Sequence, residues 1–264
     1  MPLTIDLSGR RALVTGVSSG IGAAIASTLA QAGCDVAGCG SRPAEDVGSR
    51  AFLDSVRSHG RAAHYHSVNL ATENGPAELI AFAAKALGGL DIVISNAGRN
   101  VFKGAEKCTE AAWAECINLD LASHWRLARA AKPHLDKAAQ PGVIIVIGSN
   151  HAWGTIPGCF PYNVAKAGLL GLVQSLAIEW GKQIRTVGIA PGFIDTAGND
   201  AWFNSFPDPA AERARTGKLH PVGRIGSVNE IGALCAFLAS DNAGFISGTT
   251  LLVDGGRSAL MQDS

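Results

Sequence analysis

The stretch Thr15-Gly-Val-Ser-Ser-Gly-Ile-Gly22 joins a short apolar run, Arg11–Thr15, to the helical pattern of Ile21–Ala32. Its three glycines permit, in order, a tight turn, a close approach of the backbone to a pyrophosphate, and close packing of the helix on the strand. The N–H groups at the start of the helix attract a phosphate. The stretch therefore predicts a dinucleotide site, with phosphate-binding residues Gly16, Ser18, Ser19, Gly20, Ile21 and Gly22.

Short apolar runs and longer helical patterns alternate along the chain, which is typical of βαβ units around a parallel sheet. The predicted strands are Arg11–Thr15, Asp35–Cys39, Ala62–Ser67, Ile92–Ser95, Val143–Ile147, Thr186–Ala190 and Thr250–Val253. The predicted helices include Ile21–Ala32, Pro76–Leu87, Ala111–Ala131, Tyr162–Gly181 and Val228–Ala239. We therefore predict an α/β fold: a doubly wound, parallel, seven-stranded sheet of the Rossmann type, with helices on both faces, in a single domain over residues 1–264.

One long segment, from Gly192 to about Ser227, shows no strand pattern and carries several prolines and aromatic residues. A connection of this length is more typical of a lid or a binding segment than of a simple link. We expect it to cover the substrate site.

The composition excludes several classes of protein. Of the 264 residues, 47% are hydrophobic and 17% are charged, and the 22 basic residues balance the 22 acidic ones. A disordered chain would be less hydrophobic, and a neutral chain lacks the basic face expected of a nucleic-acid-binding protein. The six cysteines form no CxxC pair, so neither a metal site nor a disulfide framework is predicted. No long apolar run predicts a membrane span, and Asp6 is atypical of a secretory signal, so we expect a cytoplasmic protein.

Tyr162-Asn-Val-Ala-Lys166 puts a phenol and an ammonium group on one face of a helix. A tyrosine titrates at about pH 10, but a neighbouring ammonium group stabilises the phenolate, as acid–base catalysis near neutral pH requires. Ser149 lies just after the apolar strand Val143–Ile147. Because the strand end and the helix start meet at the same edge of a sheet, we expect the hydroxyl groups of Ser149 and Tyr162 to lie in one cleft.

The glycine spacing, together with this serine, tyrosine and lysine, resembles the short-chain dehydrogenase/reductase family. The likeness extends over nearly the whole chain through Asn96-Ala-Gly98, Pro191-Gly192 and Val253-Asp-Gly-Gly256. Two positions depart from the family pattern, because Ser95 and Val187 stand where relatives usually carry asparagine.

The resemblance implies a reaction and the residues that carry it. The implied catalytic residues are Asn118, Ser149, Tyr162 and Lys166. In carbonyl reduction, Ser149 and Tyr162 would bind the carbonyl oxygen, a nicotinamide cofactor would supply hydride, and Tyr162 would give up its proton. Lys166 would assist Tyr162 and hold the nicotinamide ribose, and Asn118 would anchor a water that relays protons.

The end of the second strand predicts which cofactor is used. NAD sites usually carry an acid there for the ribose 2′-hydroxyl, whereas NADP sites avoid that charge and supply a cation. Here the strand is followed by Gly40-Ser41-Arg42, so NADP(H) is predicted, with NAD(H) as the alternative. Beyond the first loop, the expected cofactor contacts are Ser41, Arg42, Asn69, Leu70, Asn96, Ala97, Gly98, Tyr162, Lys166, Pro191, Gly192, Ile194 and Thr196.

Side chains near the serine and tyrosine, and others from the long segment, are predicted to face the substrate: Asn150, His151, Trp153, Phe160, Phe193 and Trp202. We expect a carbonyl reductase or alcohol dehydrogenase, and 3-oxoacyl thioesters, sugars or polyols, and bulkier cyclic ketones stay open as substrates. An NAD-dependent sugar or polyol dehydrogenase of the same family is the alternative enzyme, and a non-catalytic, cofactor-sensing regulator is the alternative class. The family resemblance also implies a homotetramer.

Overall fold

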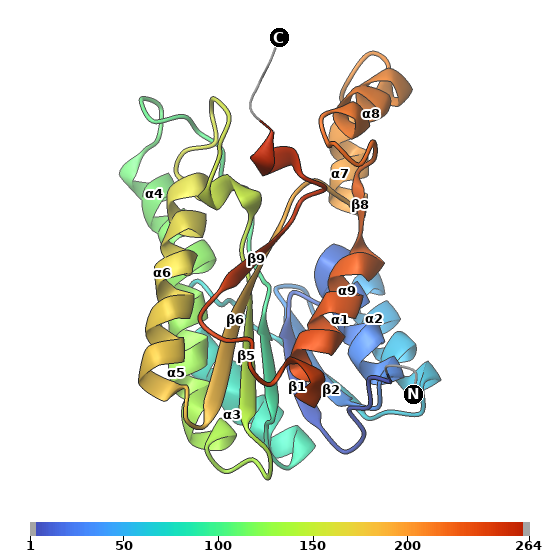
Figure 1. Ribbon diagram of the computed structural model, residues 1–264, viewed down its shortest axis with the longest axis vertical. Helices are drawn as coiled ribbons and strands as arrows, with labels where there is room; N and C mark the ends of the chain where they lie inside the picture. The colour runs from blue at the N-terminus through green and yellow to red at the C-terminus, as the bar shows by residue number, and fades with distance from the viewer. Residues whose placement is uncertain (1–3, 261–264) are drawn as a thin grey trace.

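A parallel sheet of seven strands forms the centre of the computed structural model, which describes residues 4–260 (Figure 1). The strand order across the sheet is β3-β2-β1-β4-β5-β6-β9. The strands are β1 Arg11–Thr15, β2 Asp35–Gly40, β3 Ala63–Ser67, β4 Ile92–Ser95, β5 Gly142–Ile147, β6 Ile184–Pro191 and β9 Thr250–Val253. The predicted doubly wound, seven-stranded sheet is confirmed.

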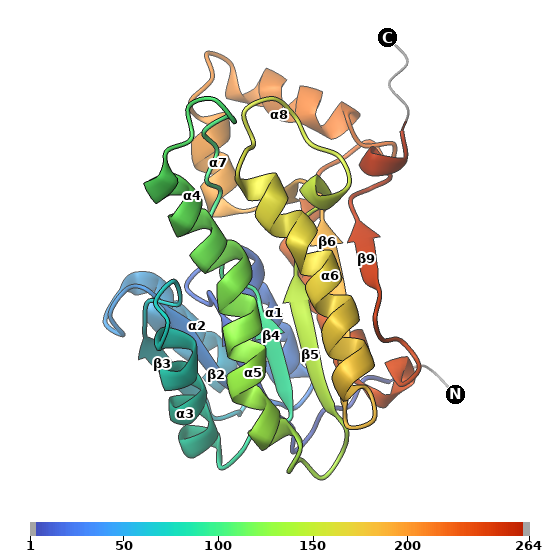
Figure 2. The same cartoon turned by 90° about the vertical axis from the view of Figure 1, so that its left-hand side faces the viewer.

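Helices cover both faces of this sheet (Figures 1 and 2). One hydrophobic core lies on each face of the sheet. α1, α2 and α9 pack over one core, and α3, α5 and α6 pack over the other. α7 and α8 stand beyond the carboxyl ends of the strands, at the top of Figure 1. The helices are α1 Gly20–Gln31, α2 Val47–Ser58, α3 Gly75–Leu87, α4 Glu110–Ile117, α5 Ser123–Leu135, α6 Tyr162–Trp180, α7 Ala197–Phe203, α8 Pro209–Lys218 and α9 Val228–Ala239.

Each central strand contributes to both cores, because successive side chains point to opposite faces. In β1, Ala12 and Val14 belong to the core under α1, α2 and α9, whereas Leu13 belongs to the other core. β5 is buried at every position, as its unbroken apolar sequence predicts. Because both faces are covered, polar functional groups are confined to the loops at the strand ends.

The strand order reverses between β1 and β4, which are neighbours in the sheet although β2 and β3 lie between them in the sequence. In open α/β sheets, ligands bind outside the carboxyl ends of the strands at such a point. The fold therefore places the loop after β1 and the loop after β4 on either side of the expected crevice.

The predicted helix Ala111–Ala131 is divided in the structure. α4 ends at Ile117, a π-helical turn covers Asn118–Ala122, and α5 begins at Ser123. A π-helical turn contains one residue more than an α-helical turn, so the side chains after it point in directions that the helical period does not predict.

The segment that was expected to lack strands contains two short ones. β7 (Ile194–Asp195) and β8 (Gly226–Ser227) pair in parallel as a separate two-stranded sheet. Two residues are too few to show a strand pattern in a sequence. The pairing joins the two ends of the segment, so that α7 and α8 form a projection held at its base.

Candidate active site

The glycine loop after β1 has the shape of a phosphate cradle. Gly16 has a φ of +74°, a left-handed conformation that favours glycine. A Cβ atom at Gly22 would lie 2.1 Å from the carbonyl oxygen of Gly16, so only glycine lets α1 begin this close to the loop. Ser19 precedes α1 without a side-chain cap bond, which leaves the first N–H groups of the helix available to an anion. The loop thus fits the pyrophosphate of a dinucleotide.

The loop after β4 is fastened to the end of β1. The Thr15 hydroxyl accepts hydrogen bonds from the backbone N–H groups of Asn96 and Ala97, each at 2.8 Å, and the Asn96 amide donates to the Thr15 carbonyl at 2.8 Å. Ser95, one of the departures from the family pattern, lies 2.7 Å from the buried imidazole of His124. These contacts hold the predicted cofactor residues after β4 beside the glycine loop.

The end of β2 presents hydroxyl groups and a guanidinium rather than an acid. The Ser18 hydroxyl lies at the end of β2, because a Cβ atom at Gly40 would be 2.5 Å from it. Ser41 and Arg42 are exposed, and Arg42 pairs with Asp46 at 3.2 Å. An exposed pair of this kind is weak, so Arg42 is available to a stronger anion.

The other predicted cofactor residues lie along the same edge. The Thr196 side chain comes within 3.4 Å of where a Cβ atom at Gly20 would be, so the segment after β6 closes over the glycine loop. The Gly192 N–H donates to the Val253 carbonyl at 3.0 Å, and the Asn69 side chain accepts the backbone N–H two residues on, at 3.0 Å. Three further predicted contacts are largely buried at this edge: Leu70, Pro191 and Ile194.

Ser149, Tyr162 and Lys166 gather where β5 ends and α6 begins. Lys166 is 3% exposed, and its ammonium nitrogen lies 5.4 Å from the centre of the Tyr162 ring. The Ser149 hydroxyl accepts the backbone N–H of His151 at 3.2 Å, and the His151 ring lies 5.8 Å from the Tyr162 ring. A Cβ atom at Gly98 would lie 3.2 Å from the Lys166 nitrogen. A hydroxyl, a phenol and an ammonium group therefore adjoin the cofactor loops.

The π-helical turn carries Asn118 and brings Asp120 to this group. The Asn118 amide oxygen accepts two hydrogen bonds from the Arg126 guanidinium, at 3.3 Å each. Asp120 lies 3.5 Å from the Lys166 ammonium nitrogen and accepts the backbone N–H of Arg99 at 3.0 Å. Sequence reasoning passed over Asp120, which is one of several polar residues in the helical pattern Ala111–Ala131 and carries no signal that sets it apart.

Burial dominates the electrostatics of this region. Burial raises the pKa of Asp120, while the Lys166 charge and the Arg99 N–H act against that rise. Burial lowers the pKa of His124 well below its usual value, and Lys166 lowers it further. The pKa of His151 is also lowered, first by burial and then by the charge of Arg257. Both imidazoles are therefore neutral at neutral pH.

Aromatic rings surround the tyrosine, and one of them was missed from the sequence. Phe102, in the loop after β4, packs edge-on against Tyr162 with ring centres 5.3 Å apart. His151 contacts both rings. Phe160 instead stacks on Trp113 at 5.5 Å.

The remaining predicted substrate residues fall into two groups. Trp153 is about half exposed, and Asn150 donates to the Ser258 hydroxyl at 3.5 Å. Phe193 and Trp202 pack against each other at the base of the projection, with ring centres 5.5 Å apart, and Trp202 also contacts Phe206.

The comparisons with known proteins agree with this geometry. A family model described as enoyl-(acyl carrier protein) reductase matches residues 16–258. The solved structure of a short-chain dehydrogenase/reductase from Serratia marcescens superposes with a TM-score of 0.87 and 30% identity, over 96% of this chain and 99% of that one. The chain belongs to the short-chain dehydrogenase/reductase family.

Relatives within the family carry different names. The chain is 36% identical to a Bacillus subtilis protein named "Probable 2,4-dienoyl-CoA reductase", over 93% of this chain and 95% of that one. It is 34% identical to 3beta-hydroxysteroid dehydrogenase 1 of Eggerthella lenta, over 95% and 94% of the two chains. Membership in the short-chain dehydrogenase/reductase family makes the chain an NAD(P)-dependent oxidoreductase, rather than the alternative class of regulator.

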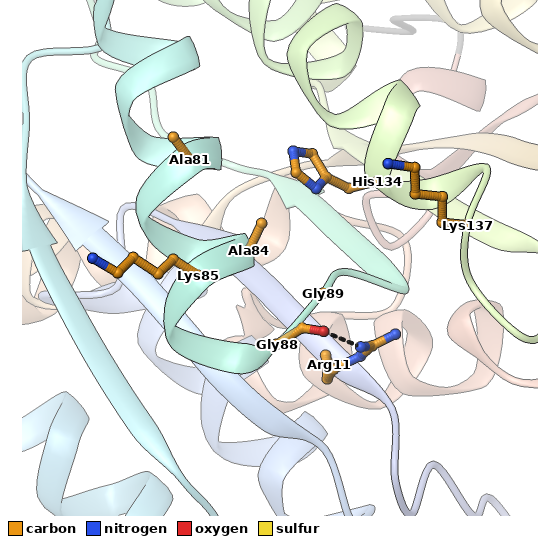
Figure 3. A pocket seen from close by; sticks show the side chains of 8 residues that line it. All are labelled: Arg11, Ala81, Ala84, Lys85, Gly88, Gly89, His134 and Lys137. Atoms are coloured by element: carbon orange, nitrogen blue, oxygen red, sulfur yellow. Dashed lines mark hydrogen bonds between the residues drawn. The ribbon is translucent and has the colours of Figure 1, made fainter.

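A pocket of about 520 Å³ lies away from the site of this short-chain dehydrogenase/reductase, between the ends of α3 and α5 (Figure 3). Arg11, Lys85, His134 and Lys137 line it, and Arg11 donates to the Gly88 carbonyl at 2.7 Å. Arg11 begins β1, so the pocket lies at the amino ends of the strands, opposite the cofactor loops.

The described residues 4–260 contain no cluster of His, Cys, Asp or Glu side chains suited to a metal ion. Among them, no helix combines the length and the apolar character that a bilayer crossing needs.

Proposed function

We propose that this enzyme interconverts a ketone and a secondary alcohol with NADP(H) as cofactor, and that Tyr162 is the acid and base of the reaction. The observation that carries the proposal is the grouping of Ser149, Tyr162 and Lys166 where β5 ends and α6 begins, with Lys166 against the loop after β4. Tyr162 and Lys166 are one helical turn apart at the start of α6, and Ser149 is held by the turn that contacts Tyr162.

The residues divide the chemistry of carbonyl reduction among them. A bound nicotinamide would supply the hydride to the carbonyl carbon. Ser149 and Tyr162 donate hydrogen bonds to the carbonyl oxygen, where negative charge grows, and Tyr162 then transfers its proton to that oxygen. Lys166 stabilises the phenolate that results. Alcohol oxidation follows the same steps in reverse, with the Tyr162 phenolate as base.

The end of β2 supports NADP(H) over NAD(H). An acid at the end of this strand would bind the ribose 2′-hydroxyl and repel a 2′-phosphate. Here Gly40 stands at the strand end, the Ser18 hydroxyl lies against it, and Arg42 follows in a weak, exposed pair. A 2′-phosphate would gain hydrogen bonds from the hydroxyl and a charged, forked partner in Arg42.

The rings around Tyr162 favour a substrate with an apolar body. Phe102 and His151 both pack on Tyr162, and burial keeps His151 neutral. A sugar or polyol would need several polar partners at this place, whereas an acyl chain or a ring system would bury against these faces. The names of two relatives, a dienoyl-CoA reductase and a hydroxysteroid dehydrogenase, fit substrates of this kind.

The test compares kcat/KM with NADPH and with NADH on a panel of 3-oxoacyl thioesters, cyclic ketones and sugars. We expect a preference for NADPH and turnover of an acyl or cyclic ketone. Tyr162→Phe is expected to keep cofactor binding, measured by NADPH fluorescence, and to lose on the order of a hundredfold or more in kcat. A clear preference for NADH would contradict the assignment of NADP(H) as cofactor. Near-normal turnover by Tyr162→Phe would contradict the role of Tyr162 as acid and base.

We also propose a homotetramer as the assembled form. Apolar side chains stand exposed on one subunit, among them Trp125 on α5 and Ile178 on α6, the latter at 83% exposure. Exposed apolar groups of this size on adjacent helices are typical of surfaces that a second copy covers.

A further inference from the structure

Asp120 is a buried carboxylate that faces the lysine of the active site. Its side chain is fully buried, that of Lys166 is nearly so, and their charged atoms lie 3.5 Å apart. A charge removed from water needs an opposite charge or several hydrogen bonds to persist. Asp120 therefore supplies the counter-charge of Lys166.

The surrounding backbone holds this pair in place. The Arg99 N–H donates to the same carboxylate oxygen that faces Lys166, at 3.0 Å. A Cβ atom at Gly98 would lie 2.5 Å from that oxygen, and one at Gly168 in α6 would lie 2.9 Å from Leu121. The π-helical turn, the loop after β4 and α6 thus approach one another closely around the two charges.

We propose that Asp120 is a positioning residue of this site: it fixes Lys166 and, through the charge of the pair, sets the pH range in which Tyr162 exchanges its proton. The proposal rests on the proposed function, because it assigns Tyr162 the acid and base role. Asp120 acts through Lys166, which its buried carboxylate faces.

The direction of the effect follows from the signs of the charges. The Lys166 ammonium stabilises the Tyr162 phenolate, and the Asp120 carboxylate, of opposite sign, offsets part of that stabilisation. With Asp120 present, Tyr162 holds its proton to a higher pH than it would beside Lys166 alone. The pair therefore favours the protonated tyrosine, which is the form that carbonyl reduction uses.

The other titratable groups around the pair do not change charge in the relevant range. On α4, burial raises the pKa of the Cys116 thiol to about 12, and Asp120 adds to the rise. On α5, His124 is kept neutral by burial, as is His151 in the turn after β5. These three groups therefore keep a constant charge between about pH 7 and pH 10, and substitution at position 120 changes the charge of the Asp120–Lys166 pair alone.

The nearby arginines contribute constant charge and are directed to other partners. The Arg126 guanidinium on α5 bonds to Asn118, and the Arg99 guanidinium pairs with Glu115 on α4. Arg257, in the turn after β9, acts on His151. These charges are the same in the wild type and in a variant at position 120, so they cancel in a comparison of the two.

The test titrates the tyrosine directly. The chain has only two tyrosines, Tyr65 and Tyr162, so carbon-13 labelling of the tyrosine Cζ atoms produces two resonances, which Tyr65→Phe assigns. The full chain, saturated with oxidised cofactor, is titrated as wild type and as Asp120→Asn. We expect the Tyr162 midpoint to fall on the order of one pH unit in Asp120→Asn. The Tyr65 midpoint should not move, because its hydroxyl bonds to the Arg42 carbonyl at the end of β2.

A matched control removes a carboxylate from another lysine–aspartate pair. Asp136, after α5, accepts from Lys132 at 2.6 Å at the amino ends of the strands, and Asp136→Asn should leave both midpoints unchanged. Asp120→Ser, a second neutral variant, should repeat the fall if Asp120→Asn folds poorly. An unchanged or higher Tyr162 midpoint in the folded variant overturns the proposal.

A turnover measurement separates this proposal from the proposed function. In Asp120→Asn the alkaline limb of the reduction rate should move to lower pH by the same amount as the Tyr162 midpoint, since Tyr162 must be protonated to act as acid. The resonance titration needs no turnover. A shifted midpoint in an enzyme that reduces no ketone would support the role of Asp120 and reject the proposed substrate class.

Discussion

Arg42 is the side chain on which the choice between the two cofactors depends. It is exposed, follows the acid-free end of β2, and is held by one weak pair with Asp46. We expect Arg42→Ala to raise the KM for NADPH about tenfold or more, because a charge-assisted bond to the phosphate is lost. The KM for NADH, which lacks that phosphate, should change little.

The control for this prediction is Arg57→Ala, which removes an exposed arginine from the last turn of α2 without approaching the strand end. Both KM values should stay as in the wild type. If Arg42→Ala changed the KM for NADPH and the KM for NADH equally, Arg42 would not bind the 2′-phosphate.

The site could be predicted from the sequence where one residue follows a strand end or begins a helix. Ser149 follows β5 and Tyr162 begins α6, so their places depend on boundaries that the sequence shows. Asn118 and Asp120 are different, because both lie within one helical pattern. Which of them faces Lys166 depends on the extra residue of the π-helical turn, and no periodic pattern reveals that residue.

At the scale of elements, the junction of β1 and α1 depends on one close contact. A Cβ atom at Gly22 would lie 2.1 Å from the Gly16 carbonyl oxygen, and backbone atoms cannot yield as a flexible side chain does. We expect Gly22→Ala to abolish detectable NADPH binding by fluorescence titration and to destabilise the fold by about 1–3 kcal/mol in urea unfolding.

Gly171 in α6 provides the matched control, since a Cβ atom there would meet nothing within 4 Å. Gly171→Ala should stabilise the chain by about 0.5–1 kcal/mol, because alanine is the better helix former, and should leave cofactor binding intact. Normal NADPH affinity in Gly22→Ala would show that the loop adapts more than its contacts indicate.

The strands were predictable where residues typical of turns bound a short apolar run. β1, β4 and β9 match their predicted bounds, although β9 is only partly buried. β6 extends beyond its prediction at both ends, from Ile184 to Pro191. β7 and β8 are set by a pairing between distant segments, which local sequence does not record.

At the scale of the whole molecule, the proposed tetramer gives a definite mass. Light scattering on the purified chain should report about 108 kDa, four times the 27.1 kDa of one chain. The physical reason is the exposed apolar area that includes Trp125 and Ile178, which a second copy would remove from water. A mass of one chain at micromolar concentration would refute the tetramer.

The contact between Asn150 and Ser258 has a practical consequence for handling the protein. It brings the last described turn of the chain to the turn that follows Ser149, whereas Thr4, at the other end of the described residues, contacts Asn242 before β9. A fluorescent label on a cysteine introduced at Ser258 would therefore lie beside the candidate active site, and one introduced at Thr4 would serve as its distant control.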